Sequence, residues 1–127
     1  MALLLVIDDN ASVRHLVCEI LTTDGHEIME AADGEIGMRI VRAHTPALVL
    51  TDIFMPNKEG IETIREIRAL VPSARIIAMT GSDPRHERLY LGAAMALGAD
   101  ATLKKPFRAS ELRDVVTGLL APLLSVS

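Results

Sequence analysis

The sequence predicts an α/β fold in which five helices cover a five-stranded, all-parallel, doubly wound sheet. Apolar runs of four or five residues recur along the chain, and the longer segments between them repeat their apolar residues at the helical period. Several of these runs are almost wholly apolar, as is typical of strands buried on both faces, whereas a strand with one solvated face alternates. Because 127 residues is about the size of one ordinary domain, we expect a single domain.

The expected strands are short and are separated by segments long enough for a crossover helix. The second one mixes charged and apolar residues, so we place it at an edge of the sheet. The five strands are residues 3–7, 27–31, 47–51, 75–79 and 101–104.

The first two helices are predicted from an apolar stripe and a residue suited to cap the first turn. Residues 11–22 carry such a stripe, and Asn10 is placed to accept a hydrogen bond from the first turn. Asp33 can cap a second helix that reaches about residue 43. We expect both helices to pack on the sheet through their apolar sides.

The remaining three helices are predicted from periodicity and from the glycines and prolines around them. A helix over residues 61–70 stops before Pro72, and another begins near Pro84 and ends at Gly98. The last helix spans about residues 109–124. The alternation of strands and helices then runs through the whole chain.

Composition excludes several functional classes. The chain has 13 Lys and Arg against 17 Asp and Glu, so its net charge of -4 gives no reason to expect nucleic acid or an anionic membrane as a partner. Cys18 is the single cysteine and cannot form an intramolecular disulfide, so we expect a structural thiol. The apolar opening is too short for a secretory signal, and no apolar run approaches the roughly 20 residues that span a bilayer. We therefore expect a cytoplasmic protein.

Polar side chains follow four of the expected strands. Asp8 and Asp9 come after the first strand, Asp52 after the third, Thr80 after the fourth and Lys105 after the fifth. In a doubly wound sheet, ligands bind at the carboxyl ends of the strands, near the point where the strand order reverses. We therefore expect these five side chains to converge there.

This combination of side chains suits phosphoryl transfer to an aspartate. Three neighbouring carboxylates repel one another unless a cation compensates, and Mg²⁺ prefers oxygen ligands of this kind. An aspartate can attack a phosphoryl group when the charge of the incoming oxygens is neutralised. Lys105 could contact a second phosphoryl oxygen and the Thr80 hydroxyl a third, so that no separate general base is needed.

Four segments resemble the motifs of bacterial response-regulator receiver domains of the chemotaxis-regulator type: LLLVIDDN, LVLTDIFMPNKEG, IIAMTG and GADATLKKPF. The resemblance covers essentially the whole chain and implies a flavodoxin-like sheet with strand order 2-1-3-4-5. It also implies a cis peptide bond between Lys105 and Pro106. The neighbouring Lys104 does not match the family's lysine.

The resemblance assigns a role to each residue of the expected site. Asp52 is the phosphoacceptor, and Thr80 and Lys105 contact the phosphoryl group, with Thr80 as the switch hydroxyl. The implied Mg²⁺ ligands are the carboxylates of Asp8, Asp9 and Asp52 and the backbone carbonyl of Phe54.

One position departs from the family pattern. Many receivers carry an aromatic residue three positions before the conserved lysine, and its ring moves when the switch hydroxyl engages phosphate. Thr102 stands there in this chain. We therefore expect the signal to travel through Thr80, the loops and the fourth helix.

The expected function is that of a stand-alone receiver, residues 1–127, without an output domain. It would accept a phosphoryl group from a histidine kinase or a histidine phosphotransfer protein and would then change its interaction with a downstream effector protein. Such a protein is a signalling switch that catalyses only its own phosphorylation and dephosphorylation. We expect a monomer or a weak dimer.

Three other functions fit the sequence less well. A dehalogenase-like phosphatase expects a second acid two positions after the nucleophile, where this chain has Phe54. A flavodoxin-like redox carrier needs a phosphate-binding loop after the first strand, which the sequence lacks. A pseudo-receiver that no longer accepts phosphate is disfavoured by the complete set of site residues.

Overall fold

The computed structural model describes residues 2–53, 60–81 and 92–124. Five strands within these ranges form one parallel sheet in the order β2-β1-β3-β4-β5. The expected parallel, doubly wound architecture and its strand order are therefore confirmed. The strands are β1 (Leu3–Ile7), β2 (Glu27–Ala31), β3 (Leu48–Asp52), β4 (Arg75–Thr80) and β5 (Ala101–Lys104).

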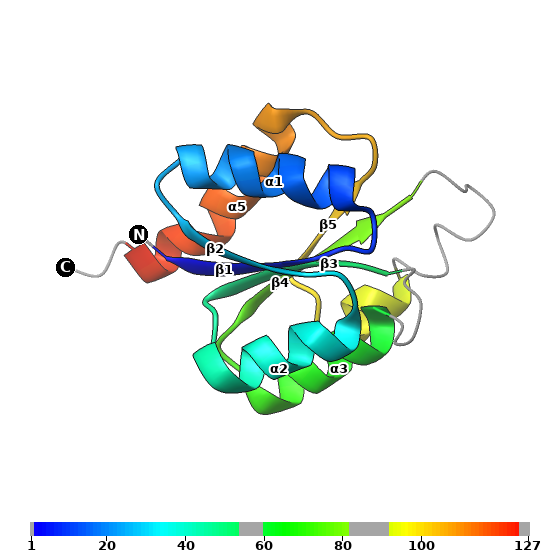
Figure 1. Ribbon diagram of the computed structural model, residues 1–127. Helices are drawn as coiled ribbons and strands as arrows, with labels where there is room; N and C mark the ends of the chain where they lie inside the picture. The colour runs from blue at the N-terminus through cyan, green and yellow to red at the C-terminus, as the bar shows by residue number, and fades with distance from the viewer. Residues whose placement is uncertain (1, 54–59, 82–91, 125–127) are drawn as a thin grey trace.

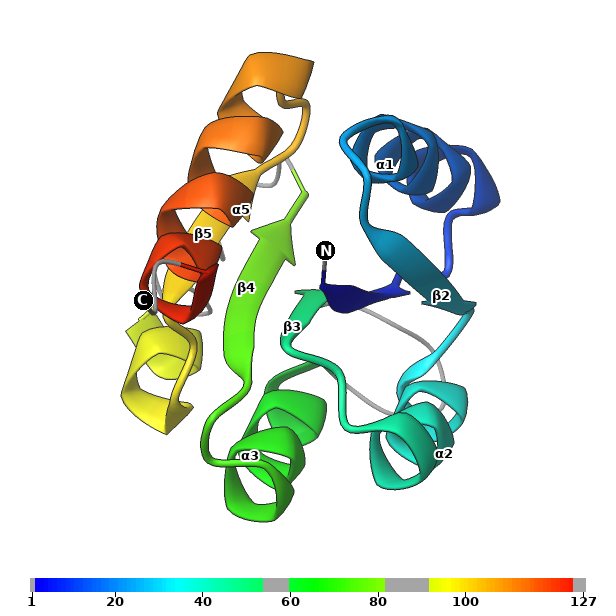
Figure 2. The same ribbon diagram turned by 90° about the vertical axis from the view of Figure 1, so that its left-hand side faces the viewer.

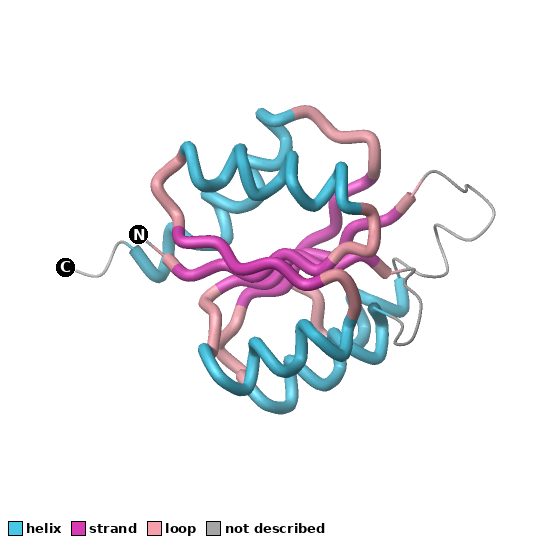
Figure 3. The backbone as a smooth tube through the Cα atoms, viewed as in Figure 1, coloured by secondary structure: helices cyan, strands magenta, loops and turns pink. Residues whose placement is uncertain are grey.

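Helices cover both faces of this sheet. The helices α1 (Ala11–Thr23) and α5 (Ala109–Leu124) lie on one face, and α2 (Gly34–His44) and α3 (Gly60–Leu70) lie on the other (Figures 1 and 2). Residues 92–97 are also helical and precede β5, so helix and strand alternate as predicted (Figure 3). No helix in the described ranges is long and apolar enough to cross a membrane.

Two strands end one residue later than expected, and this changes where two site residues lie. Asp52 pairs with Met79, and Thr80 pairs with Lys104, so both are the last residues of their strands rather than loop residues. The ladder continues because Ile53 N still donates to Met79 O at 3.0 Å. A residue inside a ladder is held more rigidly than a loop residue.

The helix bounds agree with the prediction to within one residue where both ends are described. The helices α1 and α2 each end one residue later, and α3 begins one residue earlier. The expected start of the fourth helix near Pro84 lies outside the described residues. The predicted caps are confirmed, since Asn10 Oδ1 accepts from Val13 N at 3.1 Å and Asp33 Oδ1 from Ile36 N at 2.9 Å.

The sheet separates two apolar cores. Alternate strand residues face opposite sides, so Leu5 and Val49 join the core beneath α2 and α3 while Leu4 and Leu50 join the core beneath α1 and α5. Cys18 belongs to the second core, where burial first, and then the negative charge of Glu30, raises the pKa of its thiol to about 12. The thiol is therefore protonated at neutral pH, as a structural role requires.

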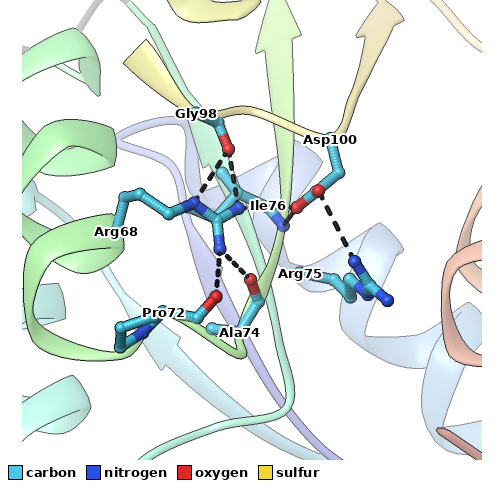
Figure 4. A network of polar contacts seen from close by, with 7 residues as sticks. All are labelled: Arg68, Pro72, Ala74, Arg75, Ile76, Gly98 and Asp100. Carbon is cyan, nitrogen blue, oxygen red and sulfur yellow. Dashed lines mark hydrogen bonds and ion pairs between the residues drawn. The ribbon is translucent and has the colours of Figure 1, made fainter.

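At the amino ends of β4 and β5, the side chain of Arg68 forms a dense set of hydrogen bonds (Figure 4). Its Nη1 donates to Pro72 O at 2.8 Å and to Ala74 O at 2.7 Å. Its Nε and Nη2 donate to Gly98 O at 3.2 and 2.6 Å, and Nη2 also reaches Asp100 Oδ2 at 2.7 Å. We call these contacts the Arg68 network.

Asp100 extends the Arg68 network to the sheet itself. Its Oδ2 accepts from Ile76 N at 2.8 Å, and its Oδ1 lies 3.8 Å from Arg75 Nη1. Gly98 permits the close approach, because its φ is +122° and a Cβ there would lie 2.9 Å from Arg68 Nε. The Arg68 network thus joins the end of α3 to the starts of β4 and β5.

Candidate functional site

The opposite end of the sheet gathers the polar residues that the sequence singled out. Asp8 directly follows β1, Asp52 ends β3, Thr80 ends β4 and Lys105 directly follows β5. All strands run in the same direction, so these positions meet at the carboxyl end of the sheet, on the right in Figure 1.

Asp8, Asp9 and Asp52 form a carboxylate cluster. Each offers one oxygen, and these oxygens all lie within 4.8 Å of one another. Asp8 is fully buried and Asp52 is 6% exposed, whereas Asp9 is exposed to solvent. Three negative charges this close repel one another, and burial makes the charges of Asp8 and Asp52 more costly. A nearby positive charge would therefore strongly stabilise the cluster.

Lys105 supplies part of that positive charge. Its Nζ lies 2.6 Å from Asp8 Oδ2 and 3.1 Å from Asp52 Oδ2, and its side chain is 18% exposed. Burial alone would lower the pKa of Lys105, but the hydrogen bond to Asp8 and the charges of Asp52 and Asp8 outweigh burial and raise it. One ammonium cannot balance three carboxylates.

Backbone contacts hold Asp8 in place within the carboxylate cluster. Its carboxylate Oδ1 accepts from Asn10 N at 2.9 Å, and its own amide donates to Ala31 O at 3.1 Å. Because Asn10 also caps α1 through its side chain, one residue fixes both the helix start and the first acidic side chain. The loop between β1 and α1 is thus firmly attached to β2.

Thr80 presents a buried hydroxyl in the same region. The residue is 1% exposed, and its Oγ1 has no hydrogen-bond partner among the described residues. An unpaired buried hydroxyl is costly, and the contrast with Thr51 is clear, because the buried Thr51 Oγ1 donates to Asp52 O at 3.1 Å. The Thr80 hydroxyl is thus available to a bound group.

Gly60, which was not among the predicted site residues, packs directly against the backbone of Asp52. Gly60 N donates to Ile53 O at 2.9 Å, and a Cβ at Gly60 would lie 2.0 Å from Asp52 O. The start of α3 therefore approaches the backbone of Asp52 so closely that only glycine fits. The signal in the sequence was the glycine that ends the segment LVLTDIFMPNKEG.

Two further predictions have different outcomes. The peptide bond between Lys105 and Pro106 is cis, as the resemblance implied. The backbone carbonyl of Phe54, expected as a metal ligand, lies outside the described residues.

Thr102, the residue that departs from the family pattern, is half-buried on β5 and pairs with Ala78.

The carboxylate cluster fits a small divalent cation with a preference for oxygen. Mg²⁺ is commonly bound by one or two carboxylates together with water and substrate phosphate. Asp9 is exposed to solvent, and the three carboxylates of the cluster offer one oxygen each, fewer than the six ligands of an octahedral Mg²⁺. Such a site leaves coordination positions for water and for a phosphoryl oxygen.

Comparison with known proteins adds a family to this geometry. Residues 4–117 match the family described as the response regulator receiver domain. The sporulation initiation phosphotransferase F of Bacillus subtilis is 33% identical over 113 residues, which are 89% of each chain. The response regulator MprA of Mycolicibacterium vanbaalenii is 32% identical over 117 residues, which are 92% of this chain and 49% of that protein. This chain thus spans about half the length of MprA.

Solved structures of similar size have the same fold. The receiver domain of NtrX from Brucella abortus superimposes with a TM-score of 0.87 at 28% identity, covering 93% of this chain and 98% of that one. The chemotaxis response regulator CheY4 of Vibrio cholerae gives a TM-score of 0.85 at 26% identity, covering 94% and 99%.

Proposed function

Since the chain belongs to the family of response regulator receiver domains, we propose that it accepts a phosphoryl group on Asp52 and thereby switches its interaction with a partner protein. Receiver domains are signalling switches of two-component systems, which agrees with the expectation that this chain is not an enzyme with an external substrate. The juxtaposition of Asp52 with Asp8, Asp9 and Lys105 at one end of the sheet is the observation that supports the assignment most directly.

In the proposed step, a carboxylate oxygen of Asp52 attacks the phosphorus of a phosphohistidine on a kinase or a phosphotransfer protein. The new P–O bond forms as the P–N bond breaks, and the electron pair of the broken bond returns to the imidazole nitrogen. The product is an acyl phosphate on Asp52. The name of the Bacillus relative, a phosphotransferase, supports transfer chemistry of this kind.

The other residues of the site stabilise charge. We propose Asp8, Asp9, Asp52 and the Phe54 carbonyl as ligands of Mg²⁺, which when bound would neutralise charge on the phosphoryl oxygens. The Lys105 ammonium already lies beside Asp52 and would donate to a second oxygen of the phosphoryl group. The Thr80 hydroxyl, which has no partner among the described residues, would donate to a third phosphoryl oxygen. Catalysis would then depend on positioning rather than on a general base.

The wider assignment is also part of the proposal. We place the protein in the cytoplasm, as a single receiver domain over residues 1–127 that receives its phosphoryl group from a histidine kinase or phosphotransfer protein and acts on a downstream effector protein. We further propose that it works as a monomer or weak dimer.

Intact mass measurement tests the proposal. The wild-type chain is incubated with a small acyl phosphate donor, with Mg²⁺ or with a chelator, and compared with the variants Asp52→Asn and Asp114→Asn. Asp114 is an exposed acid on α5 and serves as the matched control. We expect a mass gain of one phosphoryl group in wild type and in Asp114→Asn only when Mg²⁺ is present. An equal gain in Asp52→Asn would refute the assignment.

A further inference from the structure

Arg14 connects the carboxylate cluster to the edge strand of the sheet. It lies about one turn into α1, where its Nη1 donates to the backbone carbonyl of Asp8 at 2.8 Å and its Nε donates to Glu30 Oε1 at 3.0 Å. Its side chain is 15% exposed, and that of Glu30 on β2 is 39% exposed. The Arg14 guanidinium is therefore largely buried between these two partners.

The hydrogen bond from Arg14 to the Asp8 carbonyl affects where the Asp9 side chain points. The carbonyl belongs to the planar peptide unit that joins Asp8 to Asp9, so a hydrogen bond to it fixes the orientation of that plane. The plane in turn sets where the Cα of Asp9 lies and where its carboxylate can point. The Asp8 amide and carboxylate are held by Ala31 and Asn10, which leaves the carbonyl as the remaining polar group of this residue to be fixed.

General electrostatics do not explain a cation at this point of the helix. The amino end of a helix carries a partial positive charge, which disfavours an arginine near the first turn. Arg14 lies there nonetheless, and α1 has no acidic residue in its first turn. Its two specific partners, one a carboxylate and the other a backbone carbonyl, offset this disadvantage.

We propose that Arg14 is a positioning residue for the carboxylate cluster: anchored by Glu30, it holds the Asp8 carbonyl and so fixes the direction in which Asp9 presents its carboxylate to a divalent cation. This inference rests on the proposed function, because it concerns the same site. Arg14 itself touches neither the cation nor the phosphoryl group.

Calorimetric titration of the 127-residue chain with Mg²⁺ alone tests the inference. Loss of a residue that orients a metal ligand typically weakens metal affinity 10-fold to 100-fold, so we expect Arg14→Ala to weaken Mg²⁺ binding by roughly 10-fold. Arg14→Lys keeps the charge but replaces a rigid plane of donors by one flexible ammonium, so we expect nearly the same loss. The matched control is Arg113→Ala, which breaks an ion pair with Asp24 between α5 and the end of α1 and should bind as wild type.

A second measurement needs no metal. Hydrogen exchange of the Asn10 amide reports how firmly the loop is held, since this amide donates to Asp8 Oδ1. We expect severalfold faster exchange in Arg14→Ala and in Glu30→Ala than in wild type or in Arg113→Ala. Glu30→Ala removes the carboxylate that anchors Arg14 Nε, together with its 3.6 Å contact to His15 Nε2, and it keeps the test valid should Arg14→Ala fail to fold.

The outcomes separate this inference from the proposed function. Wild-type Mg²⁺ affinity in Arg14→Lys, or unchanged Asn10 exchange in Glu30→Ala, would overturn the role of Arg14 while leaving the phosphoacceptor assignment intact. Wild-type protein that binds no Mg²⁺ would overturn both.

Discussion

At the amino end of the sheet the guanidinium of Arg68 contacts three carbonyl groups and the carboxylate of Asp100, whereas at the carboxyl end Lys105 contacts two of three clustered carboxylates. In the Arg68 network, every nitrogen of the guanidinium has an acceptor. In the carboxylate cluster negative charge is in excess, and the nearby Thr80 hydroxyl has no partner among the described residues.

A functional site and a structural network can therefore be told apart within a single fold. A polar network whose donors and acceptors are matched contributes to stability and has little left to offer a ligand. A network with unmatched charge costs stability until something binds, and proteins accept such a cost mainly where they act on a ligand. The two ends should therefore respond to mutation in opposite ways.

Mutation of the Arg68 network at the amino end should reduce stability more than any other change considered below. Arg68→Met would remove the donors that satisfy Pro72, Ala74 and Gly98, and should reduce the free energy of unfolding by about 3 kcal/mol. Urea unfolding followed by circular dichroism measures this loss, with Arg39→Met on the exposed side of α2 as the control. Phosphorylation of the folded fraction should persist. A loss no larger than that of the control would show that the network is dispensable.

Gly60→Ala should have the next largest effect, because it acts on the backbone of Asp52. The added methyl group cannot fit against Asp52 O, so α3 or β3 must shift, at a cost of about 2 kcal/mol. Gly118→Ala is the matched control, since Gly118 is an exposed glycine of α5 with open space around it, and there alanine should stabilise by up to about 1 kcal/mol. Thermal unfolding distinguishes the two variants, and equal behaviour would contradict the close packing at Gly60.

Lys105→Met tests the excess of negative charge at the carboxyl end. The ammonium competes with any cation for Asp8 and Asp52, so its removal should strengthen Mg²⁺ binding roughly tenfold, or about 1.4 kcal/mol, while slowing phosphorylation. Calorimetry measures the affinity, and Lys104→Met provides the neighbouring exposed lysine as a control. Weaker Mg²⁺ binding in Lys105→Met would mean that the lysine organises the cluster rather than competing with the cation.

The smallest expected effect is a dependence of stability on alkaline pH. Because the pKa of Lys105 is raised above 10.5 in the folded protein, its stabilising contribution is fully present below 10.5 and is lost as the pH rises through the raised value. Without metal, the unfolding free energy of wild type relative to Lys105→Met should therefore fall by less than about 1 kcal/mol in this range. Denaturant unfolding at neutral and strongly alkaline pH tests the sign, and a difference that grows with pH would contradict it.

The sequence predicted the parts of the site that follow from topology. Asp8, Asp52 and Lys105 come together because the carboxyl ends of parallel strands meet, and strand positions can be recognised from apolar runs. The predicted carboxyl ends of β3 and β4 were one residue too early, because hydrophobicity does not show how far a hydrogen-bonded ladder continues through a polar residue.

The contacts that could not be predicted from the sequence depend on distances between helices and strands and on side-chain conformation. Gly60 matters because α3 approaches Asp52, and no local pattern reveals how closely two segments approach. Arg14 could be placed on a helix from the sequence, but not directed toward Asp8 and Glu30. The pairing of Arg68 with Asp100 spans 32 positions, beyond the reach of periodicity.

The two apolar cores on either side of the sheet also have an evolutionary consequence. Side chains beneath α1 and α5 do not mix with those beneath α2 and α3, because the strand backbones separate them. Substitutions in one helical layer can therefore accumulate without repacking the other, and the outer surfaces of the two layers can diversify toward different partners. The strand ends that carry the proposed phosphoryl transfer lie between the two layers, so recognition can change without altering that chemistry.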